Sequence, residues 1–139
     1  MNFTPKTDKQ IAADHLWPAG NYRFEILDLA MLGNREIETG DTVSKNGDDM
    51  ILLVVKVFNG DGRGRVLVDY LLGRYPKKLR QAAIACDLLN EYATGSISGA
   101  AFIGKTGMLK LTVEKDKTGE YGDRNAVAAY LPPQVKAAA

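Results

Sequence analysis

The stretch Met50–Leu72, MILLVVKVFNGDGRGRVLVDYLL, constrains the fold more than any other part of the sequence. Two β-rich runs flank a tip of Gly, Asp, Asn and Arg, a composition typical of a β-hairpin. We pair Phe58 with Arg65, so that Lys56 faces Leu67. Because side chains alternate across a strand, one face of this hairpin is then apolar. The other face carries an unusual mixture for a solvated surface, namely Lys56, Phe58, Arg65 and Asp69.

Length and charge bound what the chain can be. A chain of 139 residues with 45% hydrophobic and 25% charged residues is ordinary for one globular domain. A net charge of +1 excludes nucleic-acid binding through bulk charge, so any such binding must come from a local patch. Residues 63–80 contain six Lys or Arg side chains and a single acidic one, Asp69. The sequence therefore predicts one domain with a local basic segment.

Several classes of site are excluded by composition. The single cysteine, Cys86, and the single histidine, His15, rule out an intramolecular disulfide and the usual N/S metal cluster. No apolar run approaches the ~20 residues of a membrane span. The N-terminus also lacks the apolar core of a signal peptide. We therefore expect a cytoplasmic protein with no membrane association and no cofactor.

The first predicted strand has a fault in its alternation. Between Ile26 and Leu27 the inward-facing parity changes, which predicts a bulge or a sharp bend. A long first strand that curls to serve both halves of a closing sheet needs such a break. The segment that follows, residues 33–49, is polar and punctuated by glycine, and we expect a long loop there.

The second half of the chain predicts a helix and two strands. Apolar residues recur at helical spacing over residues 79–93, and Gly95 ends the pattern. The first turn is basic although the positive end of a helix prefers anions, so either a bound phosphate or plain solvation is to be expected there. Residues 108–115 alternate as a strand, residues 116–124 form a polar loop, and residues 125–131 form a last strand stopped by two prolines.

This order predicts a mainly β fold. Five strands with one α-helix between strands 3 and 4 fit an OB-fold-like barrel, in which the loops joining strands 1–2 and 4–5 flank the ligand face. An α+β sandwich with an open sheet is the main alternative. We divide the chain into an N-terminal arm (1–19), an OB-fold-like domain (20–133) and a tail (134–139), whose final alanines resemble a cloning scar.

Two glycine-rich motifs suggest nucleotide chemistry but have the wrong neighbours. Residues 99–106, GAAFIGKT, satisfy the P-loop pattern, which requires a strand before it and a helix after it. Here a predicted helix and linker precede the motif and a strand follows. The GDGRG run at 60–64 has the wrong spacing for a dinucleotide fingerprint. Acidic pairs such as Asp48-Asp49 lack a partner base, so we expect a protein that is not an enzyme.

The aromatic and basic residues that remain match the needs of single-stranded nucleic acid. Such strands are held by aromatic platforms and by a positive groove that follows the phosphates. The stacking candidates are Phe58, Tyr75 and Tyr121, and the phosphate candidates are Arg23, Lys56, Arg63, Arg65, Lys77 and Arg124, with Arg35 and Lys45 as weaker ones. The alternative is that Phe58 caps a barrel end and the cations serve solubility alone.

Four short runs resemble one known family. They are PAGNY at 18–22, SKNGDDMI at 44–51, KVFNG at 56–60 and IGKTG at 103–107. Together they are similar to small phage and prophage proteins, formerly a domain of unknown function, that are encoded among replication and recombination genes. The resemblance spans about residues 18–131 and implies an OB-fold single-stranded-DNA-binding protein in a phage-infected or lysogenic bacterial host. One departure is that the chain ends without the acidic tail by which many such proteins recruit partners.

Our hypothesis from the sequence is a sequence-nonspecific single-stranded-DNA-binding protein that acts in phage DNA replication or recombination. The partners compatible with it are single-stranded DNA, replication or recombination proteins, and a second copy of the chain in a homodimer. The alternative is a protein–protein interaction module, an adaptor or inhibitor, that uses the same exposed hairpin face.

Overall fold

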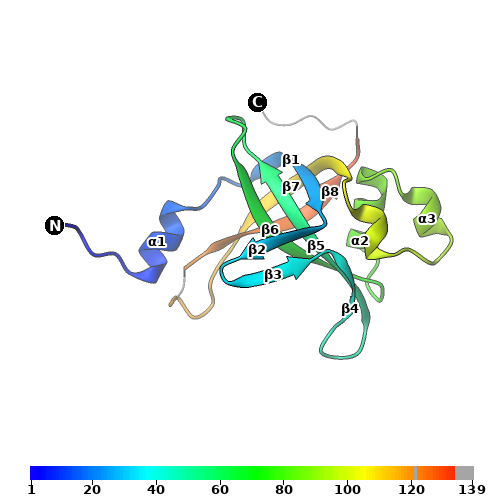
Figure 1. Ribbon diagram of the computed structural model, residues 1–139, viewed down its shortest axis with the longest axis horizontal. Helices are drawn as coiled ribbons and strands as arrows, with labels where there is room; N and C mark the ends of the chain where they lie inside the picture. The colour runs from blue at the N-terminus through cyan, green and yellow to red at the C-terminus, as the bar shows by residue number, and fades with distance from the viewer. Residues whose placement is uncertain (121, 134–139) are drawn as a thin grey trace.

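The computed structural model describes residues 1–120 and 122–133. The fold is mainly β and its strand pairs are antiparallel, as expected from the sequence (Figure 1). The elements in chain order are α1 (Asp8–Asp14), β1 (Gly20–Leu27), β2 (Leu29–Leu32), β3 (Arg35–Glu38), β4 (Gly40–Val43), β5 (Asp49–Phe58), β6 (Gly64–Leu72), α2 (Lys77–Ala85), α3 (Leu89–Ala93), the 3₁₀ helix η1 (Gly99–Phe102), β7 (Thr106–Glu114) and β8 (Arg124–Leu131).

The main sheet is organised around β5. One edge of β5 pairs with β6 along its length, and the other edge pairs with β4 in its first half and with β1 in its second half. β7 then pairs with β1, and β8 pairs with β7. Within the described residues β6 and β8 share no hydrogen-bonded ladder, so the sheet is not closed into a barrel.

A break in the first predicted strand is confirmed, but it lies at Asp28 rather than between Ile26 and Leu27. β1 ends at Leu27, the chain bends at Asp28, and β2 starts at the next residue. The hydroxyl of Thr39 fastens the point of return, because it donates to the Leu27 carbonyl (2.6 Å) and accepts from the Val54 amide (2.9 Å). At the bend β1 stops pairing with β5. β4 then pairs with the remaining part of the same edge of β5.

The expectation of a loop over residues 33–49 is wrong. β2 and β3 form a separate two-stranded hairpin with Leu32 opposite Arg35, and β4 then joins the main sheet. The two-residue turn contains Gly33 at φ +61°, a conformation that glycine adopts without strain. The polar composition of this segment hid two short strands, because neither strand is buried on both faces.

The register of the β5–β6 hairpin differs from the predicted one by one residue. Phe58 lies opposite Gly64 rather than Arg65, and Lys56 lies opposite Val66 rather than Leu67. The reason is the tip, where Asn59 accepts the amides of Asp61 and Arg63 on its side-chain oxygen (both 3.0 Å). This closed tip spans residues 59–63 and releases Gly64 to the strand.

A shift of one residue exchanges the faces of β6. The inner face of β5 is as predicted, and its buried side chains are Leu53, Val55 and Val57. Arg65 now pairs with Val57, and Asp69 pairs with Leu53, so both belong to the inner face of β6. The prediction that Arg65 and Asp69 share the outer face with Phe58 is therefore wrong.

The predicted single helix is two short helices. α2 ends at Ala85, and Asp87 at φ +59° turns the chain before α3 begins. The P-loop-like run takes no nucleotide-binding shape, because its residues 104–105 form a turn that leads into β7. The Gly104 amide donates to the Ile26 carbonyl (2.8 Å) and the Ile26 amide to the Lys105 carbonyl (2.9 Å), so this turn extends the pairing of β1 with β7.

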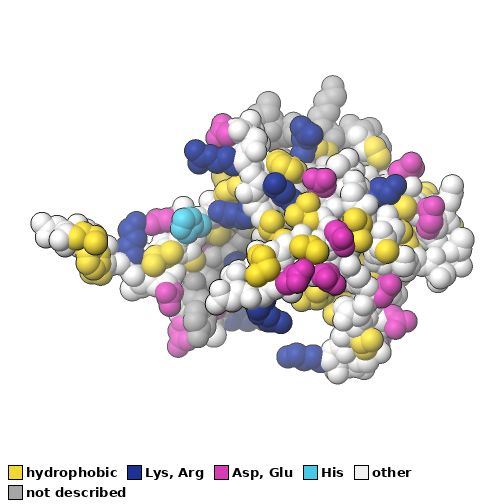
Figure 2. Space-filling view, viewed as in Figure 1, with side chains coloured by type: hydrophobic (Ala, Val, Ile, Leu, Met, Phe, Trp, Pro, Cys, Tyr) yellow, Lys and Arg dark blue, Asp and Glu magenta, His cyan; other side chains and the backbone are white. Residues whose placement is uncertain are grey.

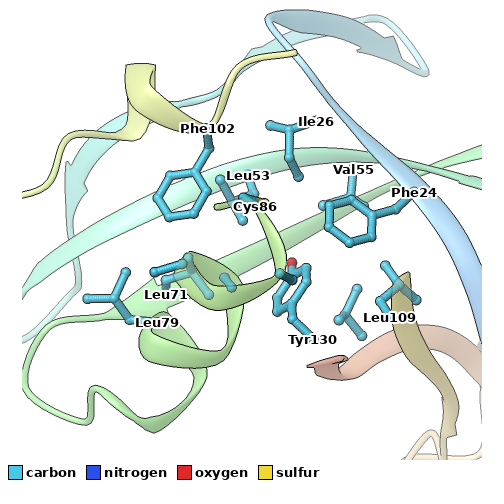
Figure 3. Packing of buried hydrophobic residues seen from close by; sticks show 14 of the residues in the cluster. Phe24, Ile26, Leu53, Val55, Leu71, Leu79, Cys86, Phe102, Leu109 and Tyr130 are labelled. Atoms are coloured by element: carbon cyan, nitrogen blue, oxygen red, sulfur yellow. The ribbon is translucent and has the colours of Figure 1, made fainter. Parts of the chain in front are cut away.

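The core fills the space between the curled sheet and α2 (Figure 3). Its largest fully buried side chains include Phe24, Phe102, Leu53, Leu71 and Leu109. The ring of Phe24 meets that of buried Tyr130 edge to face, with centroids 5.4 Å apart. Burial of this set supplies the main favourable term for folding.

Side chains bridge the two strands that no ladder joins. From β6, Asp69 accepts the Tyr130 hydroxyl of β8 (2.8 Å) and the Lys78 ammonium of α2 (2.8 Å). The same ammonium donates to the Val127 carbonyl (2.7 Å). Burial, and then the Asp69 carboxylate, raise the pKa of Tyr130 well above its usual range, so its hydroxyl remains a donor. We call Asp69, Lys78 and Tyr130 the seam triad.

We expect Asp69→Ala to lower the free energy of unfolding by about 2–4 kcal/mol, because it leaves the Lys78 ammonium without its carboxylate partner in a partly buried place. Urea denaturation followed by circular dichroism measures the change. Adding Lys78→Met should recover part of the loss. The control is Glu114→Ala, which breaks an exposed ion pair with Arg124 and should cost less than about 0.5 kcal/mol. Equal effects of the two alanine variants would contradict the role of the seam triad.

Candidate nucleic-acid interface

A groove lies where β1 and β5 separate. Their ladder stops at the pair Arg23 and Phe58, and beyond this pair the start of β1 and the β5–β6 tip diverge. The resulting groove has a volume of about 590 Å³. Its lining comes from two segments, residues 18–23 and the tip residues Phe58, Asn59, Gly60 and Gly62. The lining thus includes two aromatic residues, Tyr22 and Phe58, and one arginine, Arg23.

The outer face of the sheet continues from this groove. Arg23 is exposed and lies directly opposite Phe58 in the ladder. Lys56 lies two residues before Phe58 on the same face, with its ammonium 5.3 Å from the centroid of the Phe58 ring. The structure therefore brings together three of the residues predicted from the sequence.

Two further residues of this face, Asn21 and Lys110, are not among the predicted site residues. Lys110 of β7 is exposed and pairs with Asn21 of β1, which itself lines the groove. Alternation around buried Leu109 and Leu111 gave the outward direction of Lys110, but only the pairing of β7 with β1 brings it beside the groove. We define the groove face as Asn21, Arg23, Lys56, Phe58 and Lys110.

Arg63 is exposed on the hairpin tip, next to the groove residue Gly62. Arg65 has a different environment. Its guanidinium donates to the Asn125 side chain (2.9 Å) and lies 4.8 Å from the centroid of the Trp17 ring. Both arginines were predicted to contact phosphate. Only Arg63 is exposed, whereas the Arg65 guanidinium is held by contacts within the fold.

The N-terminal arm is held by the same cluster. The Asn125 side chain accepts the Trp17 amide and donates to the Trp17 carbonyl, both at 2.9 Å. The Trp17 ring stacks on Tyr22 with centroids 5.7 Å apart. Farther out, α1 begins with a capping box between Thr7 and Gln10. The arm is therefore fixed just before it forms one wall of the groove.

Tyr75, Lys77 and Arg124 are not part of the groove lining. Tyr75 is 65% exposed beside Arg74, and Lys77 is exposed at the start of α2. Both follow the far end of β6, roughly 25–30 Å from the hairpin tip at the usual rise per strand residue. Arg124 is exposed and pairs with Glu114 at 3.1 Å. Tyr121 lies outside the described residues.

The remaining cavities and reactive groups have other properties. A cavity of about 380 Å³ between the β4–β5 hairpin and α2 has Asp41 and Asp49 in its lining, which is unfavourable for phosphate. Burial raises the pKa of Cys86 to about 12, so this thiol is a poor nucleophile at neutral pH. In the described part of the chain no three metal-ligating side chains gather, and no helix is long and apolar enough to cross a membrane.

The β2–β3 hairpin presents a surface of opposite character. Leu29 pairs with Glu38, and Met31 pairs with Glu36, so two apolar and two acidic side chains share one face. Leu29 is 46% and Met31 60% exposed. Figure 2 shows acidic side chains next to hydrophobic ones over this hairpin. Its two glutamates make this face unfavourable for phosphates.

No protein-family model matches this chain, and a search of curated proteins finds no match. The likeness to the phage family therefore stays a hypothesis from the sequence motifs.

We expect Arg65→Ala to act on stability. It removes a hydrogen bond to a buried amide and a cation–π contact, at a cost of about 1–3 kcal/mol. Because Trp17 is the only tryptophan, its emission should shift to longer wavelength as the ring becomes solvated. Arg63→Ala is the matched control and should change the free energy of unfolding by less than about 0.5 kcal/mol. An unchanged Trp17 spectrum in Arg65→Ala would contradict the bridge.

Proposed function

We propose that this protein binds single-stranded DNA without sequence readout, through the groove face. The observation that carries the proposal is the meeting of an aromatic ring, Phe58, with cations from three strands in or beside one groove. Single strands are held by base stacking on aromatic rings and by cations along the phosphates. Paired and stacked bases in a duplex cannot reach a ring at the edge of a groove, so the same surface favours single strands.

The charge of the groove face fits this role despite the low net charge. Arg23, Lys56, Lys110 and the nearby Arg63 supply four cations, and none of them forms a salt bridge within the described residues. Glu25, opposite Lys56, is the acidic exception on this face. Binding of this kind should be moderate and sensitive to salt, because it depends on a few phosphate contacts.

The proposal also includes an OB-type fold. β1, β5, β6, β7 and β8 would be its five strands, and the β2–β3 hairpin an insertion after the first. Helices between β6 and β7 fit the usual position in that fold. The sequence motifs, rather than the geometry, support a role in phage replication or recombination in the bacterial cytoplasm.

We expect a labelled oligo-dT of about 20 nucleotides, longer than the roughly 4–16 that one OB fold occupies, to bind more tightly than a duplex of equal length. Fluorescence anisotropy at several salt concentrations gives the affinity and its salt slope. Four phosphate contacts at about 0.7 each predict a slope of about −2 to −3 in log–log form. Equal affinity for duplex, or a slope near zero, would overturn the proposal.

We expect Phe58→Ala to weaken oligo-dT binding by about 1–3 kcal/mol with an unchanged salt slope, since a stacking platform is lost and no cation is removed. The matched control is Phe3→Ala, because Phe3 is an exposed aromatic ring on the arm and lies outside the groove lining. Wild-type affinity of Phe58→Ala, with its fold intact by circular dichroism, would remove Phe58 from the interface.

A second candidate function has its own observation. The acidic and apolar face of the β2–β3 hairpin fits a protein-interaction module better than the groove face does. Under this alternative the anisotropy titration shows no oligo-dT binding even at low salt, so the same experiment separates the two functions.

A further inference from the structure

We propose that Lys56 is a displaceable cap on the stacking ring: its ammonium covers Phe58 in the free protein and moves to a phosphate when a base takes the ring. This inference rests on the proposed binding of single-stranded DNA and deepens it. Three observations support the cap: the position of the ammonium, the glycine that makes room for it, and the lack of another partner.

The first observation is the contact itself. The Lys56 ammonium lies 5.3 Å from the centroid of the Phe58 ring, within the range of a cation–π interaction. A cation and a nucleobase both seek the electron-rich face of an aromatic ring. The cation therefore holds a position that a stacked base would need.

The second observation is the space beneath the lysine. Lys56 runs along the sheet over Gly64, the residue opposite Phe58. A Cβ at position 64 would overlap Lys56 Cε and approach its Cγ at 3.4 Å. Gly64 does not have a positive φ, so its backbone does not require glycine. The absent side chain instead lets the lysine lie flat and reach the ring.

The third observation is the freedom of the ammonium. Glu25 is the cross-strand neighbour of Lys56 on β1, yet the two side chains form no salt bridge in the described structure. A cation–π contact at a half-exposed site is weak compared with the stacking of a base. Exchange of the cation for a base is thus favourable, and the released ammonium remains within reach of the neighbouring phosphate.

The test compares Gly64→Ala with Lys56→Met. Gly64→Ala pushes the lysine off the ring but keeps its charge, so we expect oligo-dT affinity to rise about two- to fivefold, the equivalent of one exposed cation–π contact, with an unchanged salt slope. Lys56→Met keeps the aliphatic part of the side chain and loses the charge, so the salt slope should become less negative by about 0.7. Gly73→Ala is the matched control, since its methyl meets nothing closer than the Asp49 carbonyl at 3.7 Å.

Proton NMR follows the cap directly. In the free protein the Lys56 Hε resonances should lie upfield because of the Phe58 ring current. This upfield shift should be absent when the wild type is saturated with oligo-dT, and absent in the free Gly64→Ala variant. Oligo-dT that binds without altering the Lys56 shift, or Gly64→Ala affinity no higher than that of Gly73→Ala, would overturn the cap alone. Absence of oligo-dT binding by the wild type at low salt would overturn the proposed function as well.

Discussion

The structure depends on side chains that join β6 to β8. A sheet of this curvature leaves two strands facing each other without a ladder, and their separation would open the core to water. Asp69 prevents this because one carboxylate accepts both a tyrosine hydroxyl from β8 and an ammonium from α2. The same ammonium reaches a β8 carbonyl, so helix and both strands meet at one point. These contacts offset the unfavourable position of the Lys78 cation in the first turn of α2.

The opposite end of this seam is closed by the arm. Asn125 holds both backbone groups of Trp17 and also accepts Arg65, so β6, β8 and the arm are joined by one amide. The arm next forms one wall of the groove, and the tip of β5–β6 forms the other. The arm that forms one wall is therefore held by interactions outside the groove.

The alternation of apolar and polar residues predicted much of this fold. The error in the register of β6 arose at the tip of the β5–β6 hairpin. The inner face of β5 follows from hydrophobic parity, which burial enforces strongly, and the parity change at Ile26 and Leu27 predicts the break after β1 to within two residues. The register of β6 depends instead on whether Gly64 belongs to the tip or to the strand. The Asn59 side chain closes the tip by hydrogen bonds to the Asp61 and Arg63 amides, which places Gly64 in the strand. The sequence alone does not show these hydrogen bonds. Likewise, the left-handed Asp87 divides a pattern that reads as one continuous helix.

The distribution of charge along the sequence likewise did not predict which cations lie together in the structure. The basic segment 63–80 is divided in space. Arg65 and Lys78 form contacts inside the fold and Arg74 lies 3.7 Å from Asp48, whereas Lys77 and Arg80 are exposed at the start of α2. The cations that do gather come from β1, β5 and β7, whose neighbourhood is created by pairing. A chain with a net charge of +1 can therefore still gather several cations beside one groove. Arg63 and Arg65 are only two residues apart but differ in this respect. Arg63 is exposed at the hairpin tip, whereas Arg65 contacts Trp17 of the arm.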